Sequence, residues 1–526
     1  MILLVAEEQD SEAAGIVEAS LCRSFTRGQV LRLASRDLPL PTDGTCAVLL
    51  NPESASATWL DGAAARRSKV LLLGHLGPAI AGLLGVTIDG VAPAGAGWSD
   101  CSPALPHAST SSPGHVVYAD TGFGALSPMR QRSLVRFDFA DEWNNLGYGR
   151  ISLDGSPWSI CQMAYHDGAA LVAELVVEGL PDRMVYAASR DLPTASLLWF
   201  NREVGPVDSQ EWRLVETFFS DYRPETLPCR PHLREIPIGY DAAVTMRLDC
   251  DEAIASARPL FELYRSRSIP FSLAITTGIS EADHSLALLR EVAAAGGSIL
   301  SHSHSHPVAW GGSGSAALEE ALRSKAWLEA ALPGTAIPYA VSPFHQTPPF
   351  ALASLWRAGY SGVIGGSIAS EPQHLLGRAG VLPFFDRPLV SHCQQCMLHG
   401  DCLADHGDPL AVYKAAFCDA RRGYSIFGYT DHPFSRRYSY GWESEAARTA
   451  IHASLLDFFQ AEGGRLLFMS ETECLDFIAM KSACAILWPS DARHFAVEGA
   501  VQGRLALAAG YRGRWWPADA PVAIDG

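Results

Sequence analysis

Two spacings of hydrophobic and polar positions alternate along residues 240–480. Short apolar runs of strand length, such as VTMRLDC, FSLAIT and SILS, are followed by stretches of helical periodicity, such as SLALLREVAAAG and AALEEALRSKAWLEAAL. The runs AIPYAV, SGVIGG, YSIFGY and RLLFM continue the strand pattern, and helical stretches follow several of them. Seven or eight such alternations predict an α/β fold of the (β/α) barrel type, possibly distorted, with the carboxyl ends of its strands on one rim.

Residues 1–235 follow a different pattern. Up to about residue 90, apolar runs such as ILLVAEE and KVLLLGH alternate with helical stretches, which predicts an α/β layer with parallel strands. From about residue 115 the pieces are shorter and strand-like. We therefore predict an N-terminal α/β and β-rich region over 1–235, with a possible split near 95–115. A barrel domain over 236–480 and a short strand-rich extension over 481–526 complete the predicted organisation.

Composition narrows the classes of partner. The net charge of −17 disfavours nucleic acid and anionic membranes, because both are bound through clustered Lys and Arg. No apolar run reaches the roughly 18 residues that a membrane-spanning helix needs. The opening residues MILLVAEEQD lack a positive region and predict a strand instead of a signal peptide, hence a cytoplasmic protein with reduced thiols. Nothing in the sequence indicates a chemistry for residues 1–235 or an oligomeric state.

Unusual polar residues stand where the predicted barrel strands end. The first, third, fourth and seventh strands end in RLDCD, SHSHSH, VSPFH and YTDHP, which supply Asp249 and Asp251, His302, His304 and His306, Ser342, Phe344 and His345, and Asp431 and His432. The carboxyl ends of barrel strands carry the chemistry in this fold class. Four polar clusters on one rim therefore predict a functional site.

The histidines suggest what that site binds. His302 and His306 lie four residues apart, so a helical turn after the strand would point both imidazoles to one side, where they could share a divalent ion. An aspartate from the first strand, Asp249 or Asp251, would complete a His, His, Asp set with open positions. The alternative is a solvated histidine loop beside an aspartate pair that caps a helix.

These motifs resemble the polysaccharide deacetylase family, also called the NodB-homology or carbohydrate esterase family 4 fold, over about residues 240–480. RLDCDE matches the family's aspartate pair in a DxD spacing, and His302, Ser303 and His306 match its His-Ser-x-x-His motif. VSPFH keeps Pro343 and Phe344 of the third motif.

Two further motifs of the family are matched unevenly. His432 in TDHPF supplies the late histidine, and the candidates for the fourth motif are Asp386 and Arg387 in FFDRP. In the third motif Ser342 stands where the family has an arginine that steadies the catalytic base. Arg387 is the candidate to replace that arginine, and without a replacement activity would be reduced or lost.

The resemblance implies a metal-dependent amide hydrolase that removes the acetyl group of an N-acetylated sugar in a polysaccharide or glycan precursor. It implies Asp249 as general base and His432 as general acid, although the DxD spacing leaves open which aspartate is base and which is ligand. Asp251, His302 and His306 would hold the metal, most often zinc, with cobalt, nickel or iron as alternatives. The metal and a backbone N–H near Phe344 would hold the oxyanion, which makes Pro343 and Phe344 the candidate oxyanion residues. Two other functions stay open: hydrolysis of a small non-sugar amide, and non-catalytic glycan binding or assembly on a degenerate barrel.

The family pattern does not explain a second stretch, SHCQQCMLHGDC. Cysteines and a histidine at this density are typical of a structural zinc loop, with Cys393, Cys396, His399 and Cys402 as candidate ligands. The alternative is a set of free thiols in a folded loop. Because connections in barrels are usually short, an insertion of this length predicts a separately stabilised segment.

Overall fold

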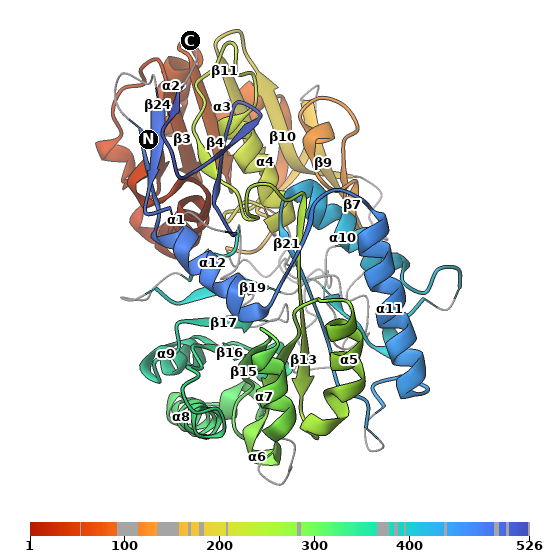
Figure 1. Ribbon diagram of the computed structural model, residues 1–526. Coiled ribbons are helices and arrows are strands. Elements are labelled where there is room, and N and C mark those ends of the chain that lie inside the picture. The colour runs from red at the N-terminus through yellow and green to blue at the C-terminus, as the bar shows by residue number, and fades with distance from the viewer. Residues whose placement is uncertain are drawn as a thin grey trace.

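The computed structural model describes most of the chain (Figure 1). The described residues are 1–52, 54–91, 114–133, 157–166, 170–177, 183–206, 209–280, 286–365, 378–382, 388–393, 396–404, 406–435, 439–488, 494–500 and 504–523. They form two large sheets and a group of small C-terminal sheets, and hydrophobic clusters fill the space between the sheets and their helices.

The first sheet has nine strands in the order β2-β1-β3-β4-β11-β10-β9-β6-β7. Its first five are β2 (Val30–Leu33), β1 (Ile2–Val5), β3 (Thr45–Leu50), β4 (Ser68–Leu73) and β11 (Ala195–Phe200), all parallel. The other four are antiparallel: β10 (Met184–Asp191), β9 (Ala170–Val177), β6 (Gly114–Tyr118) and β7 (Gln131–Ser133). The predicted N-terminal α/β layer with a β-rich continuation is confirmed. Strands from both sides of residues 95–115 share this sheet.

Four helices and a small hairpin-like sheet accompany the first sheet. The helices are α1 (Ser11–Phe25), α2 (Ser54–Ala64), α3 (Pro78–Leu84) and α4 (Ser209–Ser220). β5 (Val86–Val91) pairs antiparallel with β8 (Gln162–His166). The parallel strands β4 and β11 are buried along their whole length, and their sequences, such as VLLL in β4, are correspondingly apolar.

The second sheet carries the strand and helix alternation predicted for residues 236–480. Its main path runs β18-β19-β17-β16-β15-β14-β13-β21-β20, and β22 also pairs with β13. The strands are β13 (Ala242–Cys250), β14 (Ser272–Ile275), β15 (Ser298–Ser301), β16 (Tyr339–Val341), β17 (Gly362–Gly365), β18 (Gly380–Val381), β19 (Val390–Cys393), β20 (Cys396–Met397), β21 (Ile426–Asp431) and β22 (Leu466–Met469). All pairings are parallel except that of β18 with β19. The predicted α/β class is confirmed.

Helices follow the strands of the second sheet as the periodicity predicted. They are α5 (Arg258–Ser266), α6 (Thr277–Ser280), α7 (Leu286–Ala294), α8 (Gly314–Ala331), α9 (Pro349–Arg357), α10 (Ala411–Gly423), α11 (Glu445–Ala461) and α12 (Glu471–Ala483). The side chains of Ser313, Ser444 and Ser470 each accept a hydrogen bond from a backbone N–H in the first turn of α8, α11 and α12. Such serine caps satisfy donors that the helix itself leaves unpaired, which sets where these helices begin.

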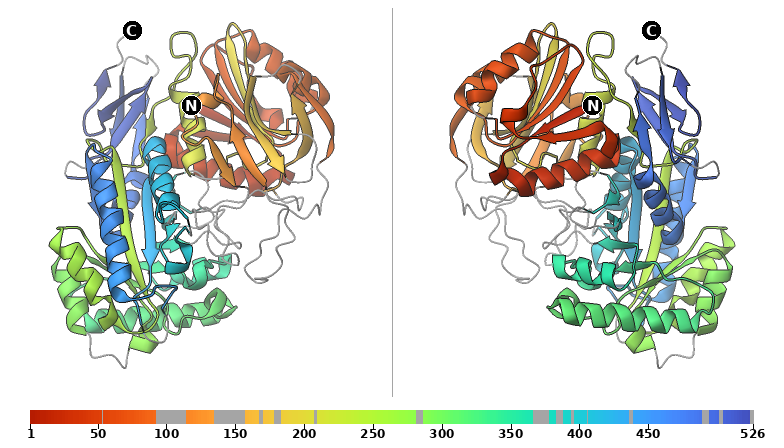
Figure 2. Two further views of the ribbon diagram at one scale, coloured as in Figure 1. Left: turned by 90° about the vertical axis from the view of Figure 1, so that its right-hand side faces the viewer. Right: turned by 90° about the vertical axis from the view of Figure 1, so that its left-hand side faces the viewer.

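The C-terminal residues form small antiparallel sheets, as the strand-rich pattern predicted. They contain β23 (Ala485–Leu487), β24 (His494–Glu498), β25 (Ala508–Tyr511), β26 (Arg514–Pro517) and β27 (Val522–Ala523). β25 also pairs with β12 (His232–Leu233), which precedes the second sheet in the chain. In both views of Figure 2 these blue strands lie beside the N-terminal sheet, and the green and cyan helices of the second sheet extend away from it.

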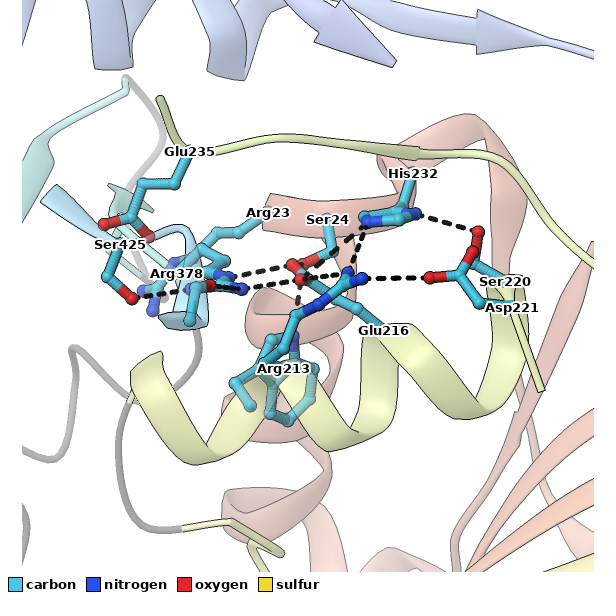
Figure 3. A network of polar contacts seen from close by, with 12 residues as sticks. Arg23, Ser24, Arg213, Glu216, Ser220, Asp221, His232, Glu235, Arg378 and Ser425 are labelled. Atoms are coloured by element: carbon cyan, nitrogen blue, oxygen red, sulfur yellow. Dashed lines mark hydrogen bonds and ion pairs between the residues drawn. The ribbon is translucent and has the colours of Figure 1, made fainter. Parts of the chain in front are cut away.

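A buried polar network ties the N-terminal helices to the second sheet (Figure 3). Glu216 on α4 accepts two hydrogen bonds from Arg378, at 2.6 and 2.8 Å, and one from Ser24 on α1, at 2.7 Å. Arg378 also donates to Ser425, next to β21. Burial alone would raise the pKa of Glu216, but the Arg378 guanidinium outweighs it and holds that pKa well below its usual range. The two regions are thus joined by a buried, ionised contact.

Candidate active site

Four side chains from three strand ends of the second sheet converge on one point. Asp251 follows β13, His302 and His306 follow β15, and His432 follows β21. Asp251 Oδ1 lies 3.4 Å from Nε2 of both His302 and His306, and Asp251 Oδ2 lies 3.4 Å from Nε2 of His432. The Nε2 atoms of His302 and His306 are 3.1 Å apart. The residues that the sequence placed on a common rim therefore meet.

The histidine pair is built by a strained turn, and here the expected helix after β15 is wrong. Ser303 has a φ of 65° and His306 a φ of 55°, so the backbone after the strand is left-handed at two positions and does not form a helix. The Ser303 hydroxyl accepts a hydrogen bond from the His306 backbone N–H at 2.9 Å, which closes the turn. Left-handed backbone at a non-glycine residue costs about 1–3 kcal/mol and persists where the surroundings fix it. The turn, instead of helical spacing, brings the imidazoles together.

His304, between the two, points elsewhere. Its Nδ1 lies 3.0 Å from the Thr277 hydroxyl, and Glu320 on α8 accepts hydrogen bonds from the backbone N–H groups of His304 and Ser305. His304 is buried. The carboxylate of Glu320 and the start of α6 thus hold the loop that presents His302 and His306.

The Asp251, His302 and His306 group fits a divalent metal ion. The three side chains offer ligand atoms within 4.8 Å of one another, and buried Asp251 Oδ1 has no hydrogen-bond partner among the described residues. Burial, together with the neighbouring His302, lowers the pKa of His306 to about 4, so its imidazole is in the neutral form that binds metals. Two imidazoles and one carboxylate form a set that suits zinc and related ions and leaves positions open.

Asp249 is held beside this group by an arginine that sequence reasoning missed. Arg247 donates to Asp249 Oδ1 at 2.8 Å and to Oδ2 at 3.2 Å, and both side chains are buried. Burial alone would raise the pKa of Asp249, but Arg247 outweighs it and holds that pKa well below its usual range. Because side chains alternate along a strand, Arg247 and Asp249 on β13 point to the same face.

The RLD sequence at the end of β13 could have revealed the pair of Arg247 and Asp249. Ser342, at the position of the family's arginine, instead has its hydroxyl 2.9 Å from that of Thr347. The side chains of Asp386 and Arg387, our sequence candidates for the fourth motif and for the replacement arginine, lie outside the described residues. Among the described residues, the arginine bound to Asp249 is its neighbour two positions earlier.

His432 is oriented by aromatic and imidazole neighbours. Its Nδ1 lies 2.8 Å from Nε2 of His399, and its ring stacks on Tyr440 with the centroids 4.4 Å apart. Burial alone would lower the pKa of His432, but its contact with Asp251 and the charge of Asp249 outweigh burial and raise it. Burial lowers the pKa of His399 to about 3, and nearby His432 adds to that effect. A neutral His399 therefore fixes the orientation of a His432 that takes up a proton readily.

A chain of buried groups continues behind Asp431. Asp431 Oδ1 accepts from the His432 backbone N–H at 2.7 Å, and Oδ2 lies 2.9 Å from His452 Nε2 on α11. His452 Nδ1 lies 3.0 Å from the hydroxyl of Tyr264, which is 2.5 Å from that of Tyr429. His452 and Tyr264 sit on separate helices with no motif around them, so the sequence offered no signal for this chain.

Pro343 and Phe344, the predicted oxyanion residues, line the same rim. The Phe344 ring lies 4.6 Å from the His306 ring, and Phe344 has a φ of 51° and His345 a φ of 55°. These two left-handed residues add to the two in the histidine turn. The strand ends β15 and β16 thus both carry strained turns around the site, which is where such strain tends to collect. The oxyanion role of Pro343 and Phe344 stays a prediction.

The cysteine-rich stretch is divided between the core and the site. Cys396 on β20 is buried in the hydrophobic core, and Nε2 of His399 lies 2.8 Å from Nδ1 of His432. The side chains of Cys393 and Cys402 lie outside the described residues. Cys418, the next cysteine along the chain, is a free thiol on α10. The second zinc site at Cys393, Cys396, His399 and Cys402 stays a prediction, and its histidine already has another partner.

Searches with protein-family models and among curated proteins find no match for this chain. Among solved structures, the chain is similar to the carbohydrate deacetylase Agd3, with 10% identity, 99% of each chain covered and a TM-score of 0.42. It is similar to the chitin deacetylase of the fungus Colletotrichum lindemuthianum, with 12% identity, 46% of this chain and 89% of the other covered, and a TM-score of 0.30. It is also similar to BA3943, a family 4 pseudoenzyme from Bacillus anthracis, with 10% identity, coverages of 45% and 66%, and a TM-score of 0.29.

Within the described residues, no helix combines the length and apolarity needed to cross a membrane. These structural likenesses are distant. Two of the three structures are described as deacetylases, of a carbohydrate and of chitin, and the third as a family 4 pseudoenzyme. The motifs of this chain resemble those of the polysaccharide deacetylases in a divergent form.

Proposed function

We propose that this protein is a metal-dependent N-deacetylase that hydrolyses the acetamide of an N-acetylated sugar in a polysaccharide or glycan precursor. The observation that carries the proposal is the convergence of Asp251, His302 and His306 beside the arginine-bound Asp249 and the histidine His432. These are a ligand set, a base and an acid at one rim, which is what hydrolysis of an unactivated amide requires.

A divalent ion bound to Asp251, His302 and His306, with zinc as our first choice, would supply acidity to a bound water and polarise the acetamide carbonyl. Asp249 stays ionised at neutral pH because Arg247 stabilises its charge, so it can accept the proton of the attacking water. Water oxygen then bonds to the acetyl carbon, and the carbon–nitrogen bond breaks. His432 donates a proton to the departing amine, which its raised pKa and its orientation by His399 favour. Backbone around Phe344 would stabilise the oxyanion.

The ion pair at Asp249 bears on the non-catalytic alternative. The sequence argument for a degenerate barrel was the missing arginine of the third motif. Arg247 binds Asp249 through two hydrogen bonds, so the carboxylate is fixed and ionised by a residue of its own strand. This observation favours an active enzyme. A small non-sugar amide remains the alternative substrate class, and the assay below separates it from an acetamido sugar.

The proposal is tested by metal analysis and acetate release on untagged protein. We expect wild type to hold about one metal equivalent more than the His302→Ala/His306→Ala variant, and acetate release from acetamido sugars to fall to background in that variant. A matched control is His166→Ala/His494→Ala, which removes two exposed histidines and should change neither quantity.

Three outcomes would contradict the proposal in different ways. Equal metal content in wild type and the rim variant would reject the ligand set. Metal loss without turnover of any acetamido sugar by wild type would favour the degenerate barrel. Turnover restricted to small non-sugar amides would replace the substrate class and keep the site.

A further inference from the structure

The N-terminal sheet has its own polar rim, made by the ends of its parallel strands. Asp10 follows β1, Asn51 follows β3, His75 follows β4 and Glu203 follows β11, and Cys161 directly precedes β8. In open parallel sheets, ligands bind outside the carboxyl ends of the strands. His75, Cys161 and Glu203 bring an imidazole nitrogen, a sulfur and a carboxylate oxygen within 4.8 Å of one another.

Asn51 organises this rim. Its Nδ2 donates to Glu203 Oε1 at 3.0 Å and to Asp10 Oδ1 at 2.9 Å, and its Oδ1 accepts from the His75 backbone N–H at 2.9 Å. Asn51 has a φ of 41°, and the following strand end requires glycine, because a Cβ on Gly74 would lie 2.1 Å from Asn51 Oδ1. The backbone of Asn51 is therefore strained, and its side-chain amide fixes both the carboxylate of Glu203 and the backbone that carries His75.

Cys161 is placed from the other side by a second amide pair. Its backbone N–H donates to the Asn201 carbonyl, and the Asn201 side chain bonds both the backbone N–H and the carbonyl of Gln162. The thiol is buried, whereas His75 and Glu203 are partly exposed. The group thus has a buried sulfur at its base and an edge toward solvent, so a ligand could reach it.

We propose that His75, Cys161 and Glu203 bind a divalent cation of the zinc class, with a fourth position open to water or a small ligand. Imidazole, thiolate and carboxylate are the three protein ligands of zinc, and three of them with a partly exposed edge is the pattern of an open site. The Asn51 amide bound to Glu203 is the kind of outer contact that orients a metal-binding carboxylate. This site is independent of the proposed deacetylase function.

The geometry of the group suits a cation. Sulfur and carboxylate oxygen lie within 4.8 Å of each other, and a cation placed between them would attract both.

A further group of possible metal ligands differs from this one in its contacts. His392, Glu471 and Cys474 also lie within 4.8 Å of one another, but all three are buried and His392 Nε2 is 2.9 Å from Glu471 Oε2. That imidazole and carboxylate already satisfy each other. Among the described residues, no hydrogen bond joins the side chains of His75, Cys161 and Glu203 to one another. The Cys161 thiol instead contacts backbone groups, the Ser159 carbonyl at 3.8 Å and the Glu203 main chain.

Cobalt binding tests the proposal on the full chain, with the metal alone as the probe. Co²⁺ added to metal-free protein gives a near-ultraviolet thiolate-to-metal absorption band only where a cysteine is a ligand, and the set of Asp251, His302 and His306 contains none. We expect the band in wild type and in His302→Ala/His306→Ala, its loss in Cys161→Ser, and no change in the matched thiol control Cys418→Ser. This pattern would separate the new site from the proposed active site.

Two results would overturn the proposal. The first is the absence of the band in wild type. The second is a band of undiminished intensity in Cys161→Ser, which would assign all of it to other cysteines such as those of the predicted zinc loop. Should Cys161→Ser fail to fold by circular dichroism, Glu203→Gln on the partly exposed edge takes its place. We expect Glu203→Gln to weaken Co²⁺ binding about tenfold or more, and unchanged affinity would reject the site.

Discussion

Both large sheets of this protein gather polar side chains at the ends of their strands, but only those of the second sheet form recognisable motifs in the sequence. In the second sheet, the rim residues come in short motifs, RLDCD, SHSHSH and TDHP, each at the end of a strand. At the first sheet, His75 and Glu203 follow strands β4 and β11, Cys161 precedes β8, and each stands alone in the sequence. Parallel topology brings the carboxyl ends of β4 and β11 together, as it does those of the second sheet. A site is readable from sequence only where several of its residues are also close in the chain.

The two rims also differ in what surrounds the candidate ligands. At the second sheet, an ion pair and an imidazole pair flank the group, so proton acceptor and donor are both at hand. At the first sheet, the immediate neighbours are the amides of Asn51 and Asn201, which hold groups in place and transfer no protons at neutral pH. We therefore expect hydrolysis at one rim and binding at the other, and substitutions at Asp249, Arg247 and Asn51 test that division.

The largest effect is expected for Asp249→Asn. The amide keeps the shape of the side chain and can still accept from Arg247, but it cannot take a proton from water. We expect kcat to fall about 10²–10⁴-fold, the usual contribution of a general base, with metal content unchanged. Steady-state acetate release and elemental analysis check both halves. A comparable kcat in Asp249→Asn would assign the base to another residue, and loss of metal would make Asp249 a ligand instead of Asp251.

A smaller loss is expected for Arg247→Ala. Without the guanidinium, Asp249 is no longer fixed, and misplacement of a reacting group by about 1 Å can cost about a hundredfold in rate. Burial then dominates and raises the pKa of Asp249, so the base becomes protonated at higher pH and the acid limb of the kcat/KM profile moves to higher pH.

The conservative variant Arg247→Lys separates positioning from folding. Lysine keeps the charge but not the paired geometry, so we expect partial recovery of rate and of the pH profile. Breaking a buried ion pair also costs about 3–5 kcal/mol of stability, so urea unfolding of both variants is the control. If folded Arg247→Ala hydrolyses substrate at the wild-type rate, Arg247 does not replace the arginine that the family has in its third motif.

The fold was predictable from periodicity, and the rim from periodicity plus motifs. Apolar runs mark parallel strands, and the ends of such strands share an edge. The sequence therefore placed Asp251, His302, His306 and His432 on one rim, where their side chains meet. The histidine turn was mispredicted as a helix, since spacing four apart suggests helical register, whereas a Ser303 hydroxyl and two left-handed residues achieve the same convergence. Long-range partners such as His399 and His452 depend on packing between distant elements, which no local pattern records.

Arg247 and Asn51 show what closer reading could and could not have found. Arg247 precedes Asp249 by two positions, so strand alternation alone places the two side chains on one face, and the pair could have been predicted. Asn51, in contrast, lies 152 residues from Glu203 in the chain and 41 from Asp10, and only the sheet order β1-β3-β4-β11 makes them neighbours. The N-terminal rim therefore becomes visible only with the structure.

The smallest effect is expected at that rim, for Asn51→Ala. The substitution removes the amide that orients Glu203 and the backbone of His75, while leaving all three candidate ligands in place. Loss of an outer contact of this kind lowers metal affinity about 10–100-fold, and we expect the lower end because Glu203 is partly exposed and can readjust. Competition between the protein and a chromogenic chelator for Co²⁺, followed through the Cys161 band, measures the change.

Asp10→Asn, which can still accept from Asn51, is the matched control and should bind as wild type does. Acetate release should stay at the wild-type rate in both variants, because the two rims belong to different sheets; a parallel loss of activity would show that the two rims are coupled and that binding and hydrolysis cannot be divided between them.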